Sequence, residues 1–272
     1  MCPPPALEML RSLFSSPGAL GWMGMGLGAV AGQSPTSRRA RPPKASHVVD
    51  LTQILTPEFP SWPGYPSLEI HNTHHLARDG FFANAWDIHE HSGTHVDAPL
   101  HFSKEGWSAA DIPAEALVVP VVVLDIRRRV RRDPDAQVRV EDVTRWEKKH
   151  GRVPPGAAVL MWSGWEDRVR DPAAYRNMDR QGIMHFPGFS REAAEFLVTE
   201  RAVGGIGVDT LSLDYGPSTD FGAHVTVLPT NRWGIENLAN LGQLPPRGAT
   251  LFAGVPRVKG ASGGPARILA VW

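Results

Sequence analysis

The sequence predicts an α/β domain that is rich in strands and contains few helices. From residue 47 onward, short apolar or alternating runs recur between clusters of turn-forming residues, and such runs indicate β-strands. Only a few longer segments carry apolar residues at the spacing of an amphipathic helix. Strands with helices between them are typical of layered domains. The chain has 272 residues, of which 42% are hydrophobic, so it is large enough to form one substantial core.

The predicted strands are spread over this whole region. The clearest is Leu117–Ile126, which consists mostly of valine and leucine. Pro120 interrupts it, and because proline cannot donate a hydrogen bond to a neighbouring strand, we expect an edge strand or a bulge there. In chain order, the predicted strands lie near 47–52, 83–90, 117–126, 157–163, 203–208, 223–228, 249–254 and 266–272.

Three helices are predicted between the strands. The first covers Val140–His150. The second covers Ser190–Arg201, where the serine is suited to the N-cap position and the following apolar residues have core spacing. The third begins near Trp233 and ends at about Leu241.

The first 46 residues differ from the rest of the chain. Arg11 precedes a weakly apolar, glycine-rich run over residues 18–31 that ends in small residues, which is the layout of a secretory signal peptide. A mis-assigned start or a disordered tail explains the same segment equally well, so both a cytoplasmic and an exported protein remain open. Residues 33–46 resemble a linker. The predicted organisation is therefore a possible signal peptide plus linker over 1–46 and one domain over 47–272.

Charge and cysteine content exclude several classes of function. Lysine plus arginine and aspartate plus glutamate both number 28, so the zero net charge favours neither nucleic acid nor an anionic membrane as a partner. The basic run Arg127–Arg132 has no aromatic residues around it and is interpreted as a solvated turn after a strand. The single cysteine, Cys2, excludes an internal disulfide and a cysteine-rich zinc site. Candidate metal ligands are thus histidine, aspartate and glutamate.

One short segment concentrates such ligands. It contains His91, His95, Asp97 and His101, and imidazoles and carboxylates bind divalent metals at catalytic sites. These positions are all odd-numbered, so an extended strand would present them on one face. A straight strand would separate the first two histidines by roughly 13 Å, which is far for two ligands of one ion. A bend, which Gly93 permits, would bring them closer.

A second polar cluster lies far along the chain and contains His224 and Glu236. A catalytic metal needs three or four protein ligands, and these two residues could complete the shell that the first segment begins. Two carboxylates, Asp97 and Glu236, could also bridge two ions. Taken alone, a loop histidine and a capping glutamate would look the same.

The pattern His91-x-Gly-Thr-His95-x-Asp97-x-Pro-x-His101 resembles the signature of the metal-dependent cyclase superfamily, which includes bacterial kynurenine formamidases and isatin hydrolases. His224 and Glu236 resemble the second ligand pair of that family. Two further matches are the Trp62-Pro-Gly turn, which resembles the substrate-facing turn of the family, and the Asp-Thr-x-Ser segment over 209–212. The resemblance covers roughly residues 47–272.

The resemblance implies a swivelling β/β/α domain that is usually oligomeric, so that a homodimer or homotetramer is expected. It further implies one or two divalent ions, zinc or manganese, in each subunit. The implied ligands of the first metal are His91, His95 and Asp97, and those of the second are Asp97, His224 and Glu236, with both carboxylates bridging the ions. The implied general acid/base is His101, and the implied substrate-binding residue is Trp62.

This ligand set fits the hydrolysis of a small-molecule amide. A divalent ion lowers the pKa of bound water from about 16 towards about 7, which supplies hydroxide, and it polarises the carbonyl group. The departing amine needs a proton, which a histidine such as His101 can donate. The expected substrate is a small aryl formamide, such as N-formylkynurenine, which would yield kynurenine and formate, or a cyclic amide such as isatin. Trp62 would offer a stacking face for the aromatic ring.

Two alternative functions are compatible with the same ligands. One is a cyclase or dehydratase that acts on a polyketide-like chain, with the metal as a Lewis acid. The other is a non-catalytic protein that binds a metal or ligand on the same scaffold, although His101 would then have no purpose. Extra residues around 127–190, compared with compact formamidases, are expected to reshape the pocket.

Overall fold

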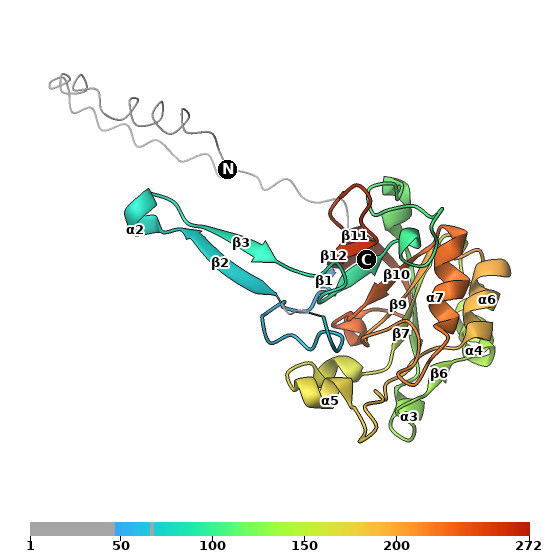
Figure 1. The fold of residues 1–272 in the computed structure, drawn as a ribbon. Helices are drawn as coiled ribbons and strands as arrows, with labels where there is room; N and C mark the ends of the chain where they lie inside the picture. The colour runs from blue at the N-terminus through green and yellow to red at the C-terminus, as the bar shows by residue number, and fades with distance from the viewer. Residues whose placement is uncertain (1–46, 66–67) are drawn as a thin grey trace, which may run out of the picture. The chain divides into compact units, whose positions relative to one another are not determined.

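The computed structural model describes residues 47–65 and 68–272. The predicted signal peptide and linker, residues 1–46, lie outside the described residues, so that prediction stays untested. A mixed sheet of nine strands organises the domain, in the order β1-β13-β11-β5-β7-β9-β10-β4-β12 (Figure 1). Its middle is parallel and consists of β5 (Val118–Asp125), β7 (Ala158–Trp162), β9 (Gly205–Val208) and β10 (Trp233–Glu236).

Antiparallel strands extend the sheet on both sides of this middle. One side holds β11 (Arg247–Gly254), β13 (Arg267–Val271) and β1 (Val48–Asp50). The other side holds β4 (His95–Asp97) and β12 (Gly263–Pro265). The sequence predicted most of these strands, but neither β4 nor β12.

Both faces of the sheet are buried, as the continuous apolar run of β5 requires. Val122 and Leu124 belong to one apolar core, whereas Val121 and Val123 belong to the core on the other face. Helices α4 (Val140–His150), α6 (Arg191–Thr199) and α7 (Gly222–Val227) stand together against the first face (Figure 1). The prediction of a strand-rich α/β domain with few helices is confirmed.

Two predicted helices are confirmed with their local signals. Helix α4 has the predicted bounds and ends at Gly151, whose φ is 88°. The side-chain oxygen of Ser190 accepts a hydrogen bond from the backbone N–H of Ala193 at 3.1 Å, which is the N-cap interaction expected for α6. Ala193 and Leu197 of α6 are buried and belong to the apolar core on the first face of the sheet.

The predicted helix over 233–241 is wrong, because residues Trp233–Glu236 form strand β10. This strand pairs with β9 on one side and β4 on the other, and all four of its residues are buried. The backbone hydrogen bonds and burial available in the middle of a sheet outweigh local helical spacing. Asn237, with φ 57°, ends the strand.

The predicted strand over 223–228 is also wrong, because Gly222–Val227 is helix α7. The Asp214 carboxylate accepts hydrogen bonds from the backbone N–H groups of Ala223 and His224, at 2.6 and 3.3 Å. These are N–H groups that a helix leaves unpaired at its start. The capping residue, Asp214, lies nine to ten residues before these N–H groups, so the apolar run over 223–228 does not reveal it.

The prediction for Pro120 is half right. Strand β5 lies between β11 and β7 and is therefore not an edge strand. Its pairing with β11 shifts register between Arg247 and Thr250, and Thr250 is the partner of Pro120. The irregularity expected of a proline inside a strand is present there.

The remaining elements are short. A hairpin of β2 and β3 carries α2 at its tip, and every residue of these three elements is at least partly exposed. None of the helices within 47–65 and 68–272 is long and apolar enough to cross a membrane. The bounds are β2 (Glu69–His74), α2 (Leu76–Asp79), β3 (Ala83–Asp87), η1 (Pro99–His101), η2 (Ala114–Leu117), α3 (Arg127–Val130), β6 (Gln137–Val138), η3 (Trp165–Arg168), α5 (Pro172–Arg176), β8 (Gly188–Phe189), η4 (Leu228–Thr230) and η5 (Leu241–Gln243).

Candidate metal centre and active site

Strand β4 places two of the predicted ligands at the centre of the site. His95 and Asp97 are two residues apart and therefore face the same side of the sheet, and both are 1% exposed. Antiparallel pairing with β10 puts Glu236 directly opposite His95 and Gly234 opposite Asp97. A side chain at position 234 would lie 3.2 Å from Asp97 Oδ2, so a glycine there leaves room for the carboxylate.

A bend brings His91 to the same place. Gly93 has φ 64°, and His91 Nδ1 lies 2.7 Å from Asp97 Oδ1. The bend expected at Gly93 is confirmed, but the extended strand that would carry all four ligand-type residues is not present. Only Asp97 and His95 lie on β4, whereas His101 lies on the 3-10 helix η1, which begins at Pro99.

The distant pair completes the cluster, as the sequence suggested. His224 Nε2 lies 3.2 Å from Glu236 Oε1 and 3.6 Å from Asp97 Oδ2. His95 Nε2 lies 3.2 Å from Asp97 Oδ1 and 3.3 Å from Glu236 Oε2. The structure therefore brings all five predicted ligands together, and each carboxylate lies between imidazoles.

The donor set fits a divalent cation. His95 Nε2 and Asp97 Oδ2 are buried, and apart from the ion-pair contacts within the cluster they have no hydrogen bond of normal geometry to any described residue. Leaving buried polar atoms unpaired is costly unless an ion or water satisfies them. One ligand atom from each of His95, Asp97 and Glu236 lies within 4.8 Å of the others. Nitrogen and oxygen ligands without sulfur suit zinc or manganese.

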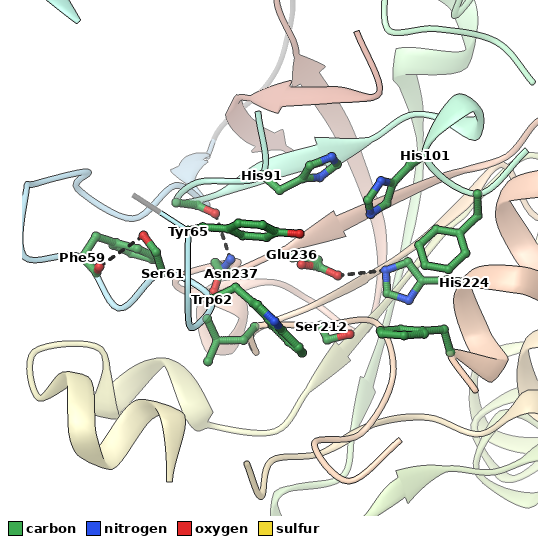
Figure 2. Close-up of a pocket in the computed structure, with 14 residues that line it drawn as sticks. Phe59, Ser61, Trp62, Tyr65, His91, His101, Ser212, His224, Glu236 and Asn237 are labelled. Carbon is green, nitrogen blue, oxygen red and sulfur yellow. Dashed lines mark hydrogen bonds and ion pairs between the residues drawn. The ribbon is translucent and has the colours of Figure 1, made fainter. Parts of the chain in front are cut away.

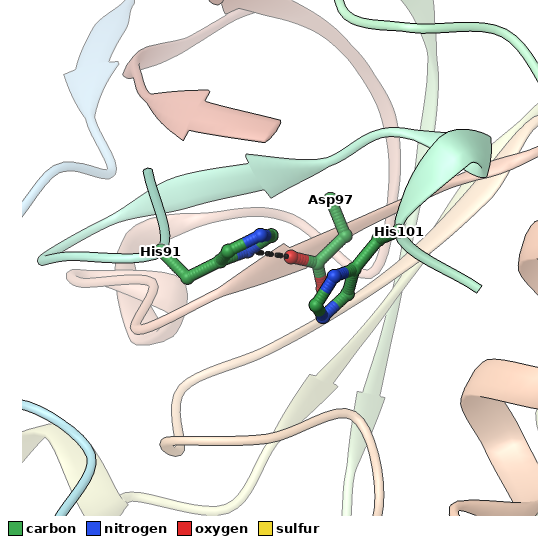
Figure 3. Close-up of side chains that lie close together, drawn as sticks. All are labelled: His91, Asp97 and His101. Atoms are coloured by element: carbon green, nitrogen blue, oxygen red, sulfur yellow. Dashed lines mark hydrogen bonds and ion pairs between the residues drawn. The ribbon is translucent and has the colours of Figure 1, made fainter. Parts of the chain in front are cut away.

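A second group of three consists of His91, Asp97 and His101, whose ligand atoms also lie within 4.8 Å of one another (Figure 3). The His101 ring stacks on the His91 ring with centroids 4.0 Å apart. Burial lowers the pKa of His101 to about 4, so its imidazole is neutral at pH 7. A neutral imidazole beside the cluster can accept a proton and later donate it.

Opposite charges dominate the electrostatics of the cluster. Burial lowers the pKa of His95, but Asp97 and Glu236 outweigh burial and raise this pKa to about 10. Burial likewise opposes the shift at His224, where Asp214 and both central carboxylates raise the pKa well above its ordinary value. Burial raises the pKa of Asp97 and that of Glu236, but the neighbouring imidazoles outweigh burial and hold both values low. A divalent cation would displace the protons shared within the cluster.

Backbone and side-chain acceptors orient two of the imidazoles. His224 Nδ1 lies 2.6 Å from Asp214 Oδ2, which directs Nε2 towards the cluster. His95 Nδ1 lies 2.9 Å from the Gly93 carbonyl oxygen, which also accepts a hydrogen bond from Asn237 Nδ2. Partners of this kind hold a ligating histidine in the tautomer that binds metal.

A cavity opens onto this cluster (Figure 2). Trp62 lines it, as the sequence suggested, and the aromatic residues Phe59, Tyr65, Phe102 and Phe221 line it too. The full lining is Phe59, Ser61, Trp62, Tyr65, His91, Gly93, His101, Phe102, Leu211, Ser212, Phe221, His224, Glu236 and Asn237. Aromatic side chains and the ligand-type residues His91, His101, His224 and Glu236 thus line the same cavity.

Sequence reasoning missed most of this aromatic wall. Phe102 and Phe221 both lie against the His224 ring, with centroid distances of 4.7 and 5.9 Å. The only available signal was position, because Phe102 directly follows His101 and Phe221 opens the segment that contains His224. Tyr65, three residues after Trp62, had no comparable signal.

Comparison with known proteins places this site in a family. The sequence model of the Cyclase family ("Putative cyclase") matches residues 49–215, a segment that includes the motif from His91 to His101. The chain belongs to the Cyclase family.

The chain is similar to proteins named as hydrolases of small-molecule amides. The chain is 34% identical to an isatin hydrolase of Roseibium aggregatum over 82% of this chain and 91% of that one. It is 29% identical to a kynurenine formamidase of Sphingopyxis alaskensis, over 82% and 97% of the two chains. A solved isatin hydrolase bound to the product analogue thioisatinate has a TM-score of 0.78 at 32% identity, with 83% of this chain and 92% of that chain covered.

These similarities confirm two predictions from the sequence. The fold is that of the Cyclase family. The chain is a metal-dependent hydrolase of carbon–nitrogen bonds other than peptide bonds, and the cyclase or dehydratase and non-catalytic alternatives are not favoured. A divalent metal is supported by the relatives and by the ligand groups described above.

Proposed function

We propose that this enzyme hydrolyses a small aryl amide, with the cyclic amide isatin as the first candidate substrate and N-formylkynurenine as the second. The observation that carries the proposal is the cavity, which aromatic side chains and metal-ligand groups line together. A planar aromatic amide can stack on an aromatic side chain there while its carbonyl group reaches the ligand groups. The greater identity to an isatin hydrolase than to the kynurenine formamidase supports the order of the two candidates.

We propose His91, His95 and Asp97 as ligands of one ion, and Asp97, His224 and Glu236 as ligands of a second where two are bound. Zinc and manganese are the proposed metals. When bound, the metal supplies a Lewis acid for the carbonyl group and lowers the pKa of water. Asp97 and Glu236 would bridge two ions, and the proximity of each carboxylate to both His95 and His224, within 3.6 Å, supports this part of the proposal.

His101 is the proposed general acid/base. Its pKa of about 4 leaves the imidazole neutral at pH 7, so a ring nitrogen can take a proton from the attacking water. The same nitrogen can then protonate the departing amide nitrogen, which is a poor leaving group without a proton.

The assay that tests the proposed function compares isatin, N-formylkynurenine and an aliphatic formamide with the purified full chain. We expect turnover of at least one aryl amide, loss of turnover after treatment with a chelator, and recovery on addition of Zn²⁺ or Mn²⁺. Slower turnover of the aliphatic formamide would reflect the missing aromatic contact. Activity that survives thorough metal removal would contradict the proposal.

Trp62 is proposed to bind the aromatic ring of the substrate, since it lines the cavity. We expect Trp62→Ala to raise KM by about 2–10-fold with little change in kcat, because an aromatic contact contributes about 0.5–1.5 kcal/mol. Trp62→Phe is the control, because it keeps an aromatic face and should keep KM near that of the wild-type enzyme. Steady-state kinetics with isatin measures both. An unchanged KM in Trp62→Ala would refute the role.

We propose that the chain assembles as a homodimer, or as a homotetramer built from such dimers, through the β2–β3 hairpin. Large apolar side chains are exposed on this hairpin, among them Trp86 at 70% and Phe82 at 64%. A hairpin of two strands is marginally stable in water unless it packs against something else. The double variant Phe82→Ser/Trp86→Ser should shift the mass measured by light scattering towards the monomer. A wild-type chain that is monomeric at micromolar concentration would contradict the assembly.

A further inference from the structure

The Ser262 side chain contacts His91, and the Glu90 side chain contacts Ser262 in turn. Ser262 Oγ lies 3.0 Å from His91 Nε2 and 2.6 Å from Glu90 Oε2. The backbone N–H of Ser262 donates to the same Glu90 oxygen at 2.9 Å. Ser262 is 171 residues from His91 in the chain, so the motif around His91 does not reveal it. These three residues are called the Glu90–Ser262–His91 relay below.

The direction of the hydrogen bonds in the relay follows from the groups themselves. A carboxylate only accepts hydrogen bonds, so the single hydroxyl proton of Ser262 is directed to Glu90. Ser262 Oγ then presents only lone pairs to His91 Nε2, and that nitrogen must carry a proton. His91 Nδ1 lies 2.7 Å from Asp97 Oδ1, and this carboxylate oxygen also only accepts, so Nδ1 donates to it until a cation takes the place of that proton. The Ser262 contact keeps the other proton on Nε2, which leaves the Nδ1 lone pair for the cation. The relay thus turns the metal-binding nitrogen towards the ligand cluster.

Packing holds the His91 ring in this orientation. A side chain at Gly263 would lie 2.8 Å from His91 Cε1, so the backbone of β12 is flush against the ring. The His101 ring stacks on His91 with centroids 4.0 Å apart. The Ser262 carbonyl oxygen accepts a hydrogen bond from the backbone N–H of Ala98 at 2.9 Å, which anchors Ser262 to the segment that follows β4. The ring has little freedom to exchange its two nitrogens.

We infer that Glu90 and Ser262 are positioning residues that select the tautomer of His91 and make it bind a divalent cation through Nδ1. This inference rests on the proposed role of His91 as a metal ligand. Without Glu90, the Ser262 hydroxyl is free to donate to His91 Nε2, which favours the tautomer with its lone pair on Nε2, and that tautomer cannot bind the cation through Nδ1. Without the Ser262 hydroxyl, His91 Nε2 loses its fixed partner. Residues that orient a metal ligand in this way typically contribute about 10–100-fold to metal affinity.

The test measures Zn²⁺ affinity of the metal-stripped full chain by competition with a chromophoric chelator. Ser262→Ala and Glu90→Ala should each weaken binding by about 10–100-fold. The double variant should weaken it no further than Ser262→Ala alone, because both residues act through one relay. The matched control is Ser92→Ala, since Ser92 is adjacent to His91 and its buried hydroxyl has no partner in the described part of the chain. This control should bind Zn²⁺ as the wild-type chain does.

Three results would overturn the relay. They are wild-type Zn²⁺ affinity in either single variant, additive losses of affinity in the double variant, and a loss in Ser92→Ala equal to that in Ser262→Ala. Thermal unfolding of each metal-stripped variant shows whether it is folded. If Ser262→Ala does not fold, Glu90→Ala at the outer end of the relay decides the question by itself. A wild-type chain that binds no Zn²⁺, or a His91→Ala variant with unchanged affinity, would instead overturn the proposed metal site. The two failures are therefore distinguishable.

Discussion

Replacing His101 with alanine should lower kcat by about 10²–10⁴-fold and leave the bound metal at the wild-type amount, because general acid/base catalysis contributes on that scale. His101 is neutral at pH 7, with its pKa lowered by burial to about 4. The variant removes the proton-transfer group from beside the cluster without removing any of the five proposed ligands. Steady-state kinetics and elemental analysis of the same preparation measure the two quantities.

The control for this variant is His150→Ala, which removes a histidine of helix α4 that does not line the cavity. It should retain wild-type turnover. Added imidazole should restore part of the activity of His101→Ala by occupying the vacated space. Full turnover in His101→Ala would refute the general acid/base role. Loss of metal together with activity would show that His101 is a ligand, as its position in the group with His91 and Asp97 allows.

Asp97→Asn should abolish hydrolysis and weaken Zn²⁺ binding by more than about 100-fold, beyond the effect of residues that only orient ligands. Asparagine keeps the shape of the side chain but removes the charge that lies 2.7 Å from His91 and 3.2 Å from His95. We also expect the metal-stripped variant to unfold at a lower temperature, because buried imidazoles lose their opposite charge. Chelator competition and thermal unfolding measure these effects.

Asp214→Asn is the matched control for this prediction. The Asp214 carboxylate is also buried and also contacts an imidazole, at 2.6 Å from His224 Nδ1, but it does not line the cavity. We expect a loss of Zn²⁺ affinity of about 10–100-fold, as for other orienting residues. Equal losses in the two variants, or wild-type binding by Asp97→Asn, would contradict the assignment of Asp97 as a ligand of the metal.

The two errors of secondary structure have the same physical origin. Residues 233–236 are a strand because β9 and β4 supply hydrogen-bond partners on both sides. Residues 222–227 are a helix because Asp214 caps its first N–H groups. In both segments the deciding partner is distant in the chain, whereas α4 and α6 were predicted correctly because their signals, N-cap and periodicity, are local.

The sequence by itself determined the chemistry of the site. The residue types and spacing of His91, His95, Asp97 and His101 indicated a divalent-metal site, because ligand type and short-range spacing can be read from the sequence. The resemblance of this motif, and of His224 and Glu236, to the metal-dependent cyclase superfamily implied a hydrolase. The sequence also identified Gly93 as a residue that permits a bend there, since glycine tolerates positive φ.

Only the tertiary structure decided how these groups meet. The pairing of β4 with β10 puts Glu236 opposite His95, and the pairing of β4 with β12 brings Ser262 to His91. The aromatic wall of the cavity is likewise assembled from separate segments. Burial and long-range pairing depend on the whole folded chain, so tautomer, orientation and pocket shape could not be derived from a short segment of sequence.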